Sequence, residues 1–197
     1  RYIPADPEYQ GNPEGVINPY PTKIDNWSPY GASKRSAETY VQEYGKSFGL
    51  PVVINRKSCI AGPFQKGFSG EQGWLSWFVR QNVVGDGTLE IFGNGKQVRD
   101  VLDARDLAEL YWLEFQKIHD LQERIFNVGG GMLNCTSLLD CLAVIENLTQ
   151  KKFTLTFKPK RTADHVFYTS DLSAVERAVG WIPHISFRKT IQDMIAE

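Results

Sequence analysis

The sequence predicts an α/β protein in which short strands alternate with amphipathic helices. Short apolar runs rich in Val, Ile and Phe alternate along the chain with longer segments whose apolar residues recur every three or four positions. The 197 residues are 42% apolar, which is enough for one substantial core. Strands that alternate with helices in this way are typical of a parallel sheet covered by helices.

The first predicted element is a helix that begins at Ser28, because serine is a favoured N-cap and Pro29 takes the first helical position. We expect this helix to end at Gly49. Its apolar residues recur at helical spacing: Ala37, Tyr40, Val41, Tyr44 and Phe48. The 27 residues before Ser28 are rich in Pro, Asn, Gly and Tyr and show no apolar period, so we expect a loop cut from a larger protein.

The rest of the chain continues the alternation. The run PVVIN at residues 51–55 predicts a buried parallel strand, and Gly93-Asn94-Gly95 predicts a turn. Further strands are predicted at residues 89–92, 98–102, 125–128 and 153–157. Further helices are predicted at residues 74–84, 103–118 and 136–148, and Asp103 and Thr136 are the expected caps of the last two. Two short final helices are predicted after Asp171 and Ser186, around Gly180 and Pro183.

The charge balance, the cysteines and the lengths of the apolar runs indicate which partners and which compartment to expect. With 22 basic and 23 acidic residues spread along the chain, we expect neither a nucleic-acid nor a membrane partner, and small ligands are favoured. Three cysteines, an odd number without metal-ligand spacing, predict reduced thiols in the cytoplasm and no metal site: Cys59, Cys135 and Cys141. No apolar run is long enough to predict a transmembrane span, and we expect no signal peptide.

Tyr30 and Lys34 stand four residues apart at the start of the first predicted helix, so their side chains share one face. A nearby ammonium group stabilises a phenolate, and a tyrosine with an ordinary pKa of ~10 becomes a usable base only with such help. The spacing alone is a weak motif, because tyrosine and lysine are both frequent in this chain.

Several motifs in one order are more specific. They are SPYGASK at 28–34, RKSCIAGP at 56–63, GNGKQVRDVLDARDLAELY at 93–111, FNVGGG at 126–131, RTAD at 161–164 and DLSAVERAVGWIP at 171–183. Together they resemble the extended short-chain dehydrogenase/reductase family, the nucleotide-sugar epimerases and dehydratases, over nearly every residue from Trp27 onward. EQGWLSWFV at 71–79 with GKQVRD looks most like the CDP-tyvelose epimerase branch, also called CDP-paratose 2-epimerase.

The resemblance implies the C-terminal part of a Rossmann-type parallel sheet joined to a smaller α/β substrate-binding domain. Residues 1–62 would belong to the NAD-binding domain and carry the catalytic helix. Residues 63–197 would be mainly the nucleotide-sugar domain, with segments near 98–128 returning to the Rossmann sheet. A dinucleotide site needs a glycine turn after the first strand, and none occupies that place here. Gly129-Gly130-Gly131 comes too late and is interpreted as a substrate-domain turn.

The resemblance also assigns roles. Tyr30 matches the general base, Lys34 matches the lysine that holds the nicotinamide ribose and lowers the tyrosine's pKa, and Ser58 matches a cofactor-binding position. In such enzymes NAD takes a hydride from a sugar carbon while the tyrosinate takes the hydroxyl proton. The keto-sugar then turns over and recovers the hydride on its other face. The family's upstream serine or threonine, which orients the substrate hydroxyl, is absent from the sequence.

Five residues match substrate-binding positions: Cys59, Gln72, Arg99, Asn127 and Arg161. The two arginines match residues that grip the nucleotide diphosphate, a task suited to permanently charged guanidinium forks. Other interpretations stay open. Arg99 can form a strand-end ion pair with Asp100, and Arg161 lies in a basic loop that solvent can surround. Asn127 is also a turn former, and Cys59 stands where many relatives carry asparagine, so it can be a small buried hydrophobe.

The resemblance therefore implies an NAD-dependent nucleotide-sugar epimerase of the CDP-paratose/CDP-tyvelose type in carbohydrate (lipopolysaccharide) biosynthesis, acting at C2 of a CDP-linked sugar. We also expect the protein to be cytoplasmic and homo-oligomeric. One alternative is a nucleotide-sugar 4,6-dehydratase or reductase of the same family. Another is a noncatalytic fragment that binds, or formerly bound, a nucleotide sugar. Because the dinucleotide turn is missing, we expect these 197 residues alone to hold no stoichiometric NAD and to be inactive.

Overall fold

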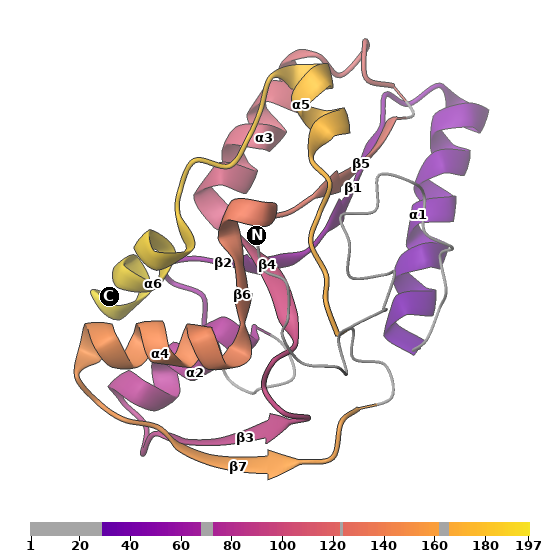
Figure 1. The fold of residues 1–197 in the computed structure, drawn as a ribbon. Helices are drawn as coiled ribbons and strands as arrows, with labels where there is room; N and C mark the ends of the chain where they lie inside the picture. Colours follow the sequence, from indigo (N-terminus) through magenta and orange to yellow (C-terminus); the bar gives the residue numbers. More distant parts are fainter. Residues whose placement is uncertain (1–28, 68–72, 123, 162–165) are drawn as a thin grey trace.

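The computed structural model describes residues 29–67, 73–122, 124–161 and 166–197 (Figure 1). The strands are β1 (Val53–Lys57), β2 (Cys59–Ala61), β3 (Thr88–Phe92), β4 (Val98–Asp103), β5 (Arg124–Val128), β6 (Cys135–Ser137) and β7 (Thr154–Lys158). The helices are α1 (Pro29–Phe48), α2 (Trp74–Val83), α3 (Ala104–Gln116), α4 (Leu138–Thr149), α5 (Ser173–Val179) and α6 (Phe187–Ile195), with the 3-10 turn η3 (Met132–Asn134). The predicted α/β class is confirmed.

In the part of the chain that the structure describes, the strands form three small sheets. β1 pairs in parallel with β5, and β3 pairs in parallel with β7. In the third group β4 is central, parallel to β2 on one side and antiparallel to β6 on the other. Ser58 links the first group to the third, because it lies between β1 and β2 and its amide donates to the carbonyl of Val128 at 2.9 Å. The predominance of parallel pairs agrees with the alternating sequence pattern.

Most predicted boundaries hold to within two or three residues, and two of the predicted helix caps are confirmed. Asp103 and Ser186 cap their helices by accepting the amides of Arg105 and Lys189. The predicted cap Thr136 is wrong, because Ser137 holds that position in α4 and accepts the amide of Asp140 at 3.1 Å. Ser28 lies outside the described residues.

The start of α5 and the turn between β3 and β4 differ in part from the expectation. The N-cap of α5 is Leu172, although Asp171 next to it does accept the amide of Ser173 at 2.9 Å. The predicted turn between β3 and β4 is present, with Gly93 and Gly95 at φ of 81° and 76°. It does not join a hairpin, because β3 pairs with β7 and β4 pairs with β2 and β6. Gly49 follows α1 at φ 66°, as a C-terminal glycine should.

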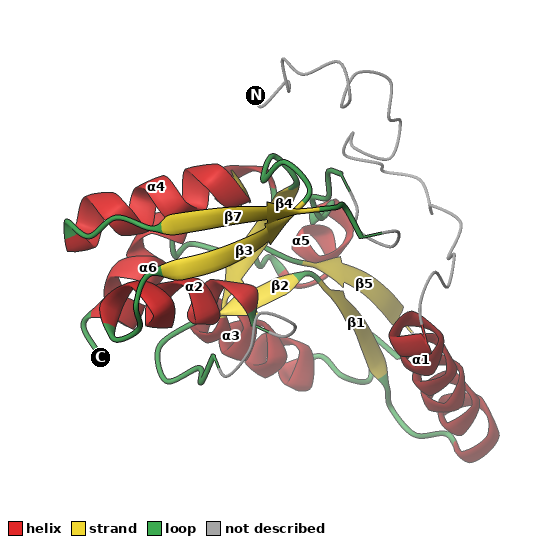
Figure 2. Ribbon diagram, turned by 90° about the horizontal axis from the view of Figure 1, so that it is seen from below, coloured by secondary structure: helices red, strands yellow, loops and turns green. Residues whose placement is uncertain are grey.

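Among the described residues, two apolar clusters form the core. One gathers α2, α4, α6 and the inner face of β3, where Leu89 and Ile91 are buried between exposed neighbours. The other gathers α3, β4, β5 and α5 around Trp181, which is 2% exposed. Figure 2 shows α1 at one side of the molecule, next to β1 and β5. Within the described part of the chain, no helix has the length and apolar character needed to cross a membrane.

Candidate functional site

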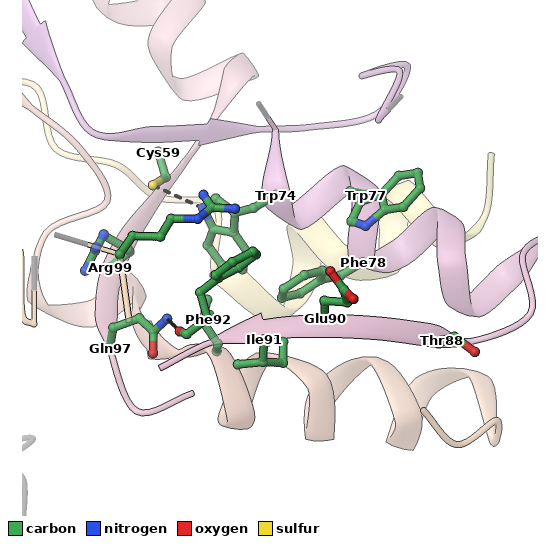
Figure 3. A pocket seen from close by; sticks show the side chains of 12 residues that line it. Cys59, Trp74, Trp77, Phe78, Thr88, Glu90, Ile91, Phe92, Gln97 and Arg99 are labelled. Carbon is green, nitrogen blue, oxygen red and sulfur yellow. Dashed lines mark hydrogen bonds between the residues drawn. The ribbon is translucent and has the colours of Figure 1, made fainter. Parts of the chain in front are cut away.

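A cavity of about 530 Å³ opens between α2, β3 and β4 (Figure 3). Its walls are strongly aromatic and carry two guanidinium groups. The lining residues are Cys59, Trp74, Trp77, Phe78, Thr88, Glu90, Ile91, Phe92, Gln97, Arg99, Leu138 and Arg161. Apolar walls with a few charged groups are typical of pockets that bind small organic ligands.

The aromatic wall follows from the start of α2. Gly73 precedes the helix at φ 67°, a left-handed conformation that glycine adopts without strain, and the helix then begins at Trp74. The next helical turn supplies Trp77 and Phe78, and the rings of Trp74 and Phe78 pack edge to face at 5.4 Å. This helix was predicted from its sequence, but its role in lining a pocket was not, although the clustered aromatic residues of GWLSWF were a signal for it.

Arg99 and Arg161 both line this cavity, although 61 residues separate them in the sequence. The guanidinium carbon of Arg161 lies 4.0 Å from the centroid of the Phe92 ring, a cation–π contact that positions the charge over the pocket. Arg161 therefore has a defined aromatic contact in addition to its solvent exposure. Two permanent positive charges beside aromatic walls suit an anionic, partly aromatic ligand such as a nucleotide.

Asp100, the sequence neighbour of Arg99, faces away from the pocket because successive strand residues point to opposite sides. Its carboxylate Oδ2 accepts the amides of Gly131 at 3.1 Å and Ser170 at 3.0 Å. Burial raises the pKa of this carboxyl above its ordinary value, against the opposing effect of the Ser170 hydrogen bonds. Asp100 is thus a buried anchor for two loops.

Cys59 lies against the aromatic wall. The indole nitrogen of Trp74 donates to its sulfur at 3.3 Å (Figure 3), and burial raises the pKa of the thiol. A neutral, partly buried thiol beside an indole gives the pocket an apolar patch where an asparagine would present two polar groups.

Tyr30 and Lys34 lie side by side on the first turns of α1, with the lysine Nζ 5.4 Å from the centroid of the tyrosine ring. The tyrosine is 63% exposed, so its hydroxyl is open to a ligand. Neither residue lines the aromatic cavity. The structure therefore presents the predicted site residues as two groups, an arginine and cysteine group in the cavity and a tyrosine–lysine pair on α1.

The remaining predicted site residues take other places. Ser58 donates its hydroxyl to the carbonyl of Asp100 at 3.2 Å and so helps to join β2 and β4. Asn127 is exposed on β5 opposite Arg56 of β1 and does not line the cavity. Gln72 lies outside the described residues.

The glycine triplet has a structural reason that the sequence did not reveal. A Cβ at Gly129 would collide with Asp100, Ser170 and Ser58, and one at Gly130 would collide with the carbonyl of Val101. These glycines let the chain pass close to β4, and a short 3-10 turn follows them. Their backbone is occupied by packing, which agrees with the interpretation of a turn outside the dinucleotide site.

Comparison with known proteins gives a family match. The model of the NAD dependent epimerase/dehydratase family matches residues 7–129. CDP-paratose 2-epimerase of Salmonella typhi is 34% identical over 177 residues, covering 88% of this chain and 52% of that protein. A dTDP-glucose 4,6-dehydratase of Haemophilus influenzae is 28% identical over 178 residues, covering 85% of this chain and 51% of that protein. The chain thus spans about half the length of these curated relatives.

Solved structures match the fold. UDP-glucose 4-epimerase of Thermotoga maritima, solved with UDP-glucose, has a TM-score of 0.78 at 25% identity and covers 87% of this chain and 53% of its own. UDP-glucuronic acid 4-epimerase of Bacillus cereus, solved with UDP-glucuronic acid and NAD, has a TM-score of 0.77 at 23% identity and covers 92% and 58%. These matches confirm the predicted Rossmann-type α/β fold, and NAD is the cofactor named for the family.

Proposed function

Because the chain belongs to the NAD dependent epimerase/dehydratase family, we propose that it provides the substrate pocket and the catalytic helix of a nucleotide-sugar epimerase acting on a CDP-linked sugar. The observation that carries the proposal is the cavity in which Arg99 and Arg161 stand beside an aromatic wall. The preference for cytidine rests on the similarity to CDP-paratose 2-epimerase.

The arginines are proposed to pair with the diphosphate. Each guanidinium stays charged at all physiological pH values and can donate two parallel hydrogen bonds to phosphate oxygens. The base and sugar would then contact the aromatic residues, of which Phe92 already holds Arg161 in place. Cys59 and Trp74 present little polarity to the sugar, which suits a hexose that lacks hydroxyl groups.

The residues of α1 fit the nicotinamide end of an NAD site, because Tyr30 and Lys34 share a face and both are exposed. Bound NAD would supply the reversible oxidation of a sugar carbon. The phenolate of Tyr30 would accept the proton of the sugar hydroxyl during oxidation and return it during reduction. Lys34 would stabilise that phenolate and hydrogen-bond the ribose.

Among the described residues, no glycine turn leads from a strand into a helix of more than one turn in the manner that holds a pyrophosphate. We therefore propose that this chain alone binds nucleotide sugar weakly or moderately, holds no stoichiometric NAD and does not turn over substrate. Assembly as a homo-oligomer in the cytoplasm is part of the same proposal.

A 4,6-dehydratase of the same family is the second candidate, supported by the 28% identity to the Haemophilus influenzae dehydratase. Both reactions begin with oxidation of the sugar. Dehydration also needs an acid and a base that act at C5 and C6 of the sugar. In the described chain we assign an acid–base role to Tyr30 alone, which favours the epimerase. Assay of a chain with a complete NAD site on CDP-paratose and on dTDP-glucose would separate the two candidates.

The pocket itself is tested by Arg99→Ala and calorimetric titration with CDP and with cytidine. We expect the variant to weaken CDP by about 1.5–3 kcal/mol, the range for hydrogen bonds to charged groups, and to leave cytidine unchanged. Lys96→Ala, a nearby exposed cation outside the lining, serves as the control. Equal losses for both ligands would show that Arg99 is structural.

A further inference from the structure

A second group of titratable side chains lies away from the aromatic cavity, where the first turn of α3 meets the loop before α6. Asp106 on α3 is fully buried, and its carboxylate Oδ2 accepts the amides of His184 at 3.2 Å and Ile185 at 3.0 Å. The indole of Trp181 donates to the Asp106 carbonyl at 3.0 Å. These hydrogen bonds tie both the carboxylate and the backbone of Asp106 to residues 181–185.

The other oxygen of Asp106 has no such partner. Oδ1 is enclosed, and within the described chain no hydrogen bond reaches it. The Nδ1 atom of His184 lies 2.9 Å away, but the pair lacks the geometry of a hydrogen bond. Glu109, one turn further along α3, places Oε2 3.4 Å from the same Nδ1. These three atoms lie within 4.8 Å of one another.

We propose that Asp106 Oδ1, Glu109 Oε2 and His184 Nδ1 form a binding site for a divalent transition-metal ion, with Zn²⁺ as the type case. The three atoms lie within 4.8 Å of one another, a spacing at which one cation can contact all three. One imidazole with two carboxylates is a donor set that zinc accepts, whereas Ca²⁺ and Mg²⁺ prefer oxygen alone.

Burial and charge both favour a cation here. The Asp106 side chain is fully buried, and its Oδ1 has no hydrogen-bond partner among the described residues. A dication would neutralise this buried carboxylate and Glu109 together. His184 and Glu109 are 65% and 49% exposed at their side chains, so an ion can enter, and water can complete its coordination.

The site joins two parts of the fold. α3 belongs to the core cluster around Trp181, whereas the loop after His184 leads to α6, whose Ile191 lies in the other cluster. A bound ion would hold the loop to α3 and stabilise the folded chain, since a ligand that binds only the folded state raises its stability by mass action. The role is structural, and it is independent of the proposed epimerase activity.

The test uses the 197-residue chain after removal of metal with EDTA. Calorimetric titration with ZnCl₂ should show one site per chain, and the melting temperature should rise with zinc concentration. His184→Ala and Glu109→Gln should each weaken zinc by roughly 10–100-fold, at least the loss seen when an outer-shell partner of a metal is removed. His119→Ala, which removes an exposed histidine outside the site, should leave the affinity unchanged.

The spectrum of the Co²⁺ form adds a readout of the ligands. Nitrogen and oxygen ligation predicts no thiolate-to-cobalt charge-transfer band. Absence of zinc binding, or zinc binding that both His184→Ala and Glu109→Gln leave intact, would overturn the proposal. A thiolate band, or an equal loss in His119→Ala, would also overturn it by placing the ion at a cysteine or at scattered histidines.

Discussion

The contact between Arg161 and Phe92 predicts that an aromatic ring controls the affinity for phosphate. The guanidinium carbon lies 4.0 Å from the ring centroid, well inside the ~6 Å reach of a cation–π interaction. Arg161 itself is exposed and lies three residues after the end of β7, so the Phe92 ring is a defined contact for its guanidinium. Removing the ring should therefore loosen the guanidinium without removing its charge.

The expected loss of CDP affinity differs between Arg161→Ala and Phe92→Leu. Arg161→Ala removes charge-assisted hydrogen bonds to the diphosphate and should cost about 1.5–3 kcal/mol of CDP binding, roughly a 10- to 150-fold loss. Phe92→Leu keeps an apolar side chain but removes a cation–π contact worth about 0.5–1 kcal/mol at an exposed site, roughly a two- to fivefold loss. In the double variant the ring has no charge left to position, so the two losses should not add.

Calorimetric titration of the four proteins with CDP and with cytidine measures this cycle. Arg161→Ala should spare cytidine, because the nucleoside lacks the phosphates. Full additivity for CDP would show that Phe92 acts on the ligand and not through Arg161. A loss of cytidine binding in Arg161→Ala as large as that of CDP would refute the assignment of the diphosphate to this arginine.

Two further predictions concern Tyr30 on α1 and the buried carboxyl of Glu114 on α3. In a chain that carries a complete NAD site, Tyr30→Phe should lower kcat by about 10²–10⁴-fold, with nucleotide-sugar affinity nearly unchanged, whereas the matched control Tyr40→Phe on the same helix should keep full activity. Glu114 is buried, and burial raises its pKa above the ordinary 4.5 despite a hydrogen bond from Asn55, so its stabilising contribution is full below pH 4.5 and is lost as pH rises through the raised value. In thermal melts, the change in melting temperature that Glu114→Gln causes relative to the wild-type chain should therefore be more favourable at pH 7 than at pH 4. The exposed control Glu176→Gln should show no such difference between the two pH values.

The fold was predictable to the extent that local patterns determine it. The helical spacing of Tyr40, Tyr44 and Phe48 predicted α1, and the β-branched run at 51–55 predicted β1 within two residues. The three-residue strands β2 and β6 were missed, because their pairing with β4 depends on contacts distant in sequence. No local pattern at CTS in β6 distinguishes a strand from the cap of the helix that follows.

The candidate site was predictable only where a sequence motif marks a residue. The motif match selected Cys59, Arg99 and Arg161, and the structure places all three on one cavity. The neighbours that define their chemistry, Phe92 under Arg161 and Trp74 beside Cys59, come from long-range packing that spacing cannot reveal. The cluster of Asp106, Glu109 and His184 was likewise not predictable, since His184 stands 75 positions after Glu109 in the sequence.

The last prediction concerns association through α1. This helix buries only Gly45, and its apolar residues Tyr40, Tyr44 and Phe48 are 70%, 52% and 69% exposed. Tyr44 and Phe48 also contact each other, with ring centroids 5.2 Å apart, and so form a continuous aromatic surface. Exposed apolar surface of this kind is typical of an interface.

We expect light scattering to show self-association of the wild-type chain, and Tyr44→Glu combined with Phe48→Glu to abolish it while CDP binding persists, because neither residue lines the cavity. The matched control is Trp112→Glu on α3, where an aromatic side chain is 59% exposed. Two carboxylates in an apolar interface lose their hydration without gaining partners, which costs far more than the contacts return. A wild-type chain that stays monomeric at high concentration would refute the prediction, and association abolished only by Trp112→Glu would move the interface to α3.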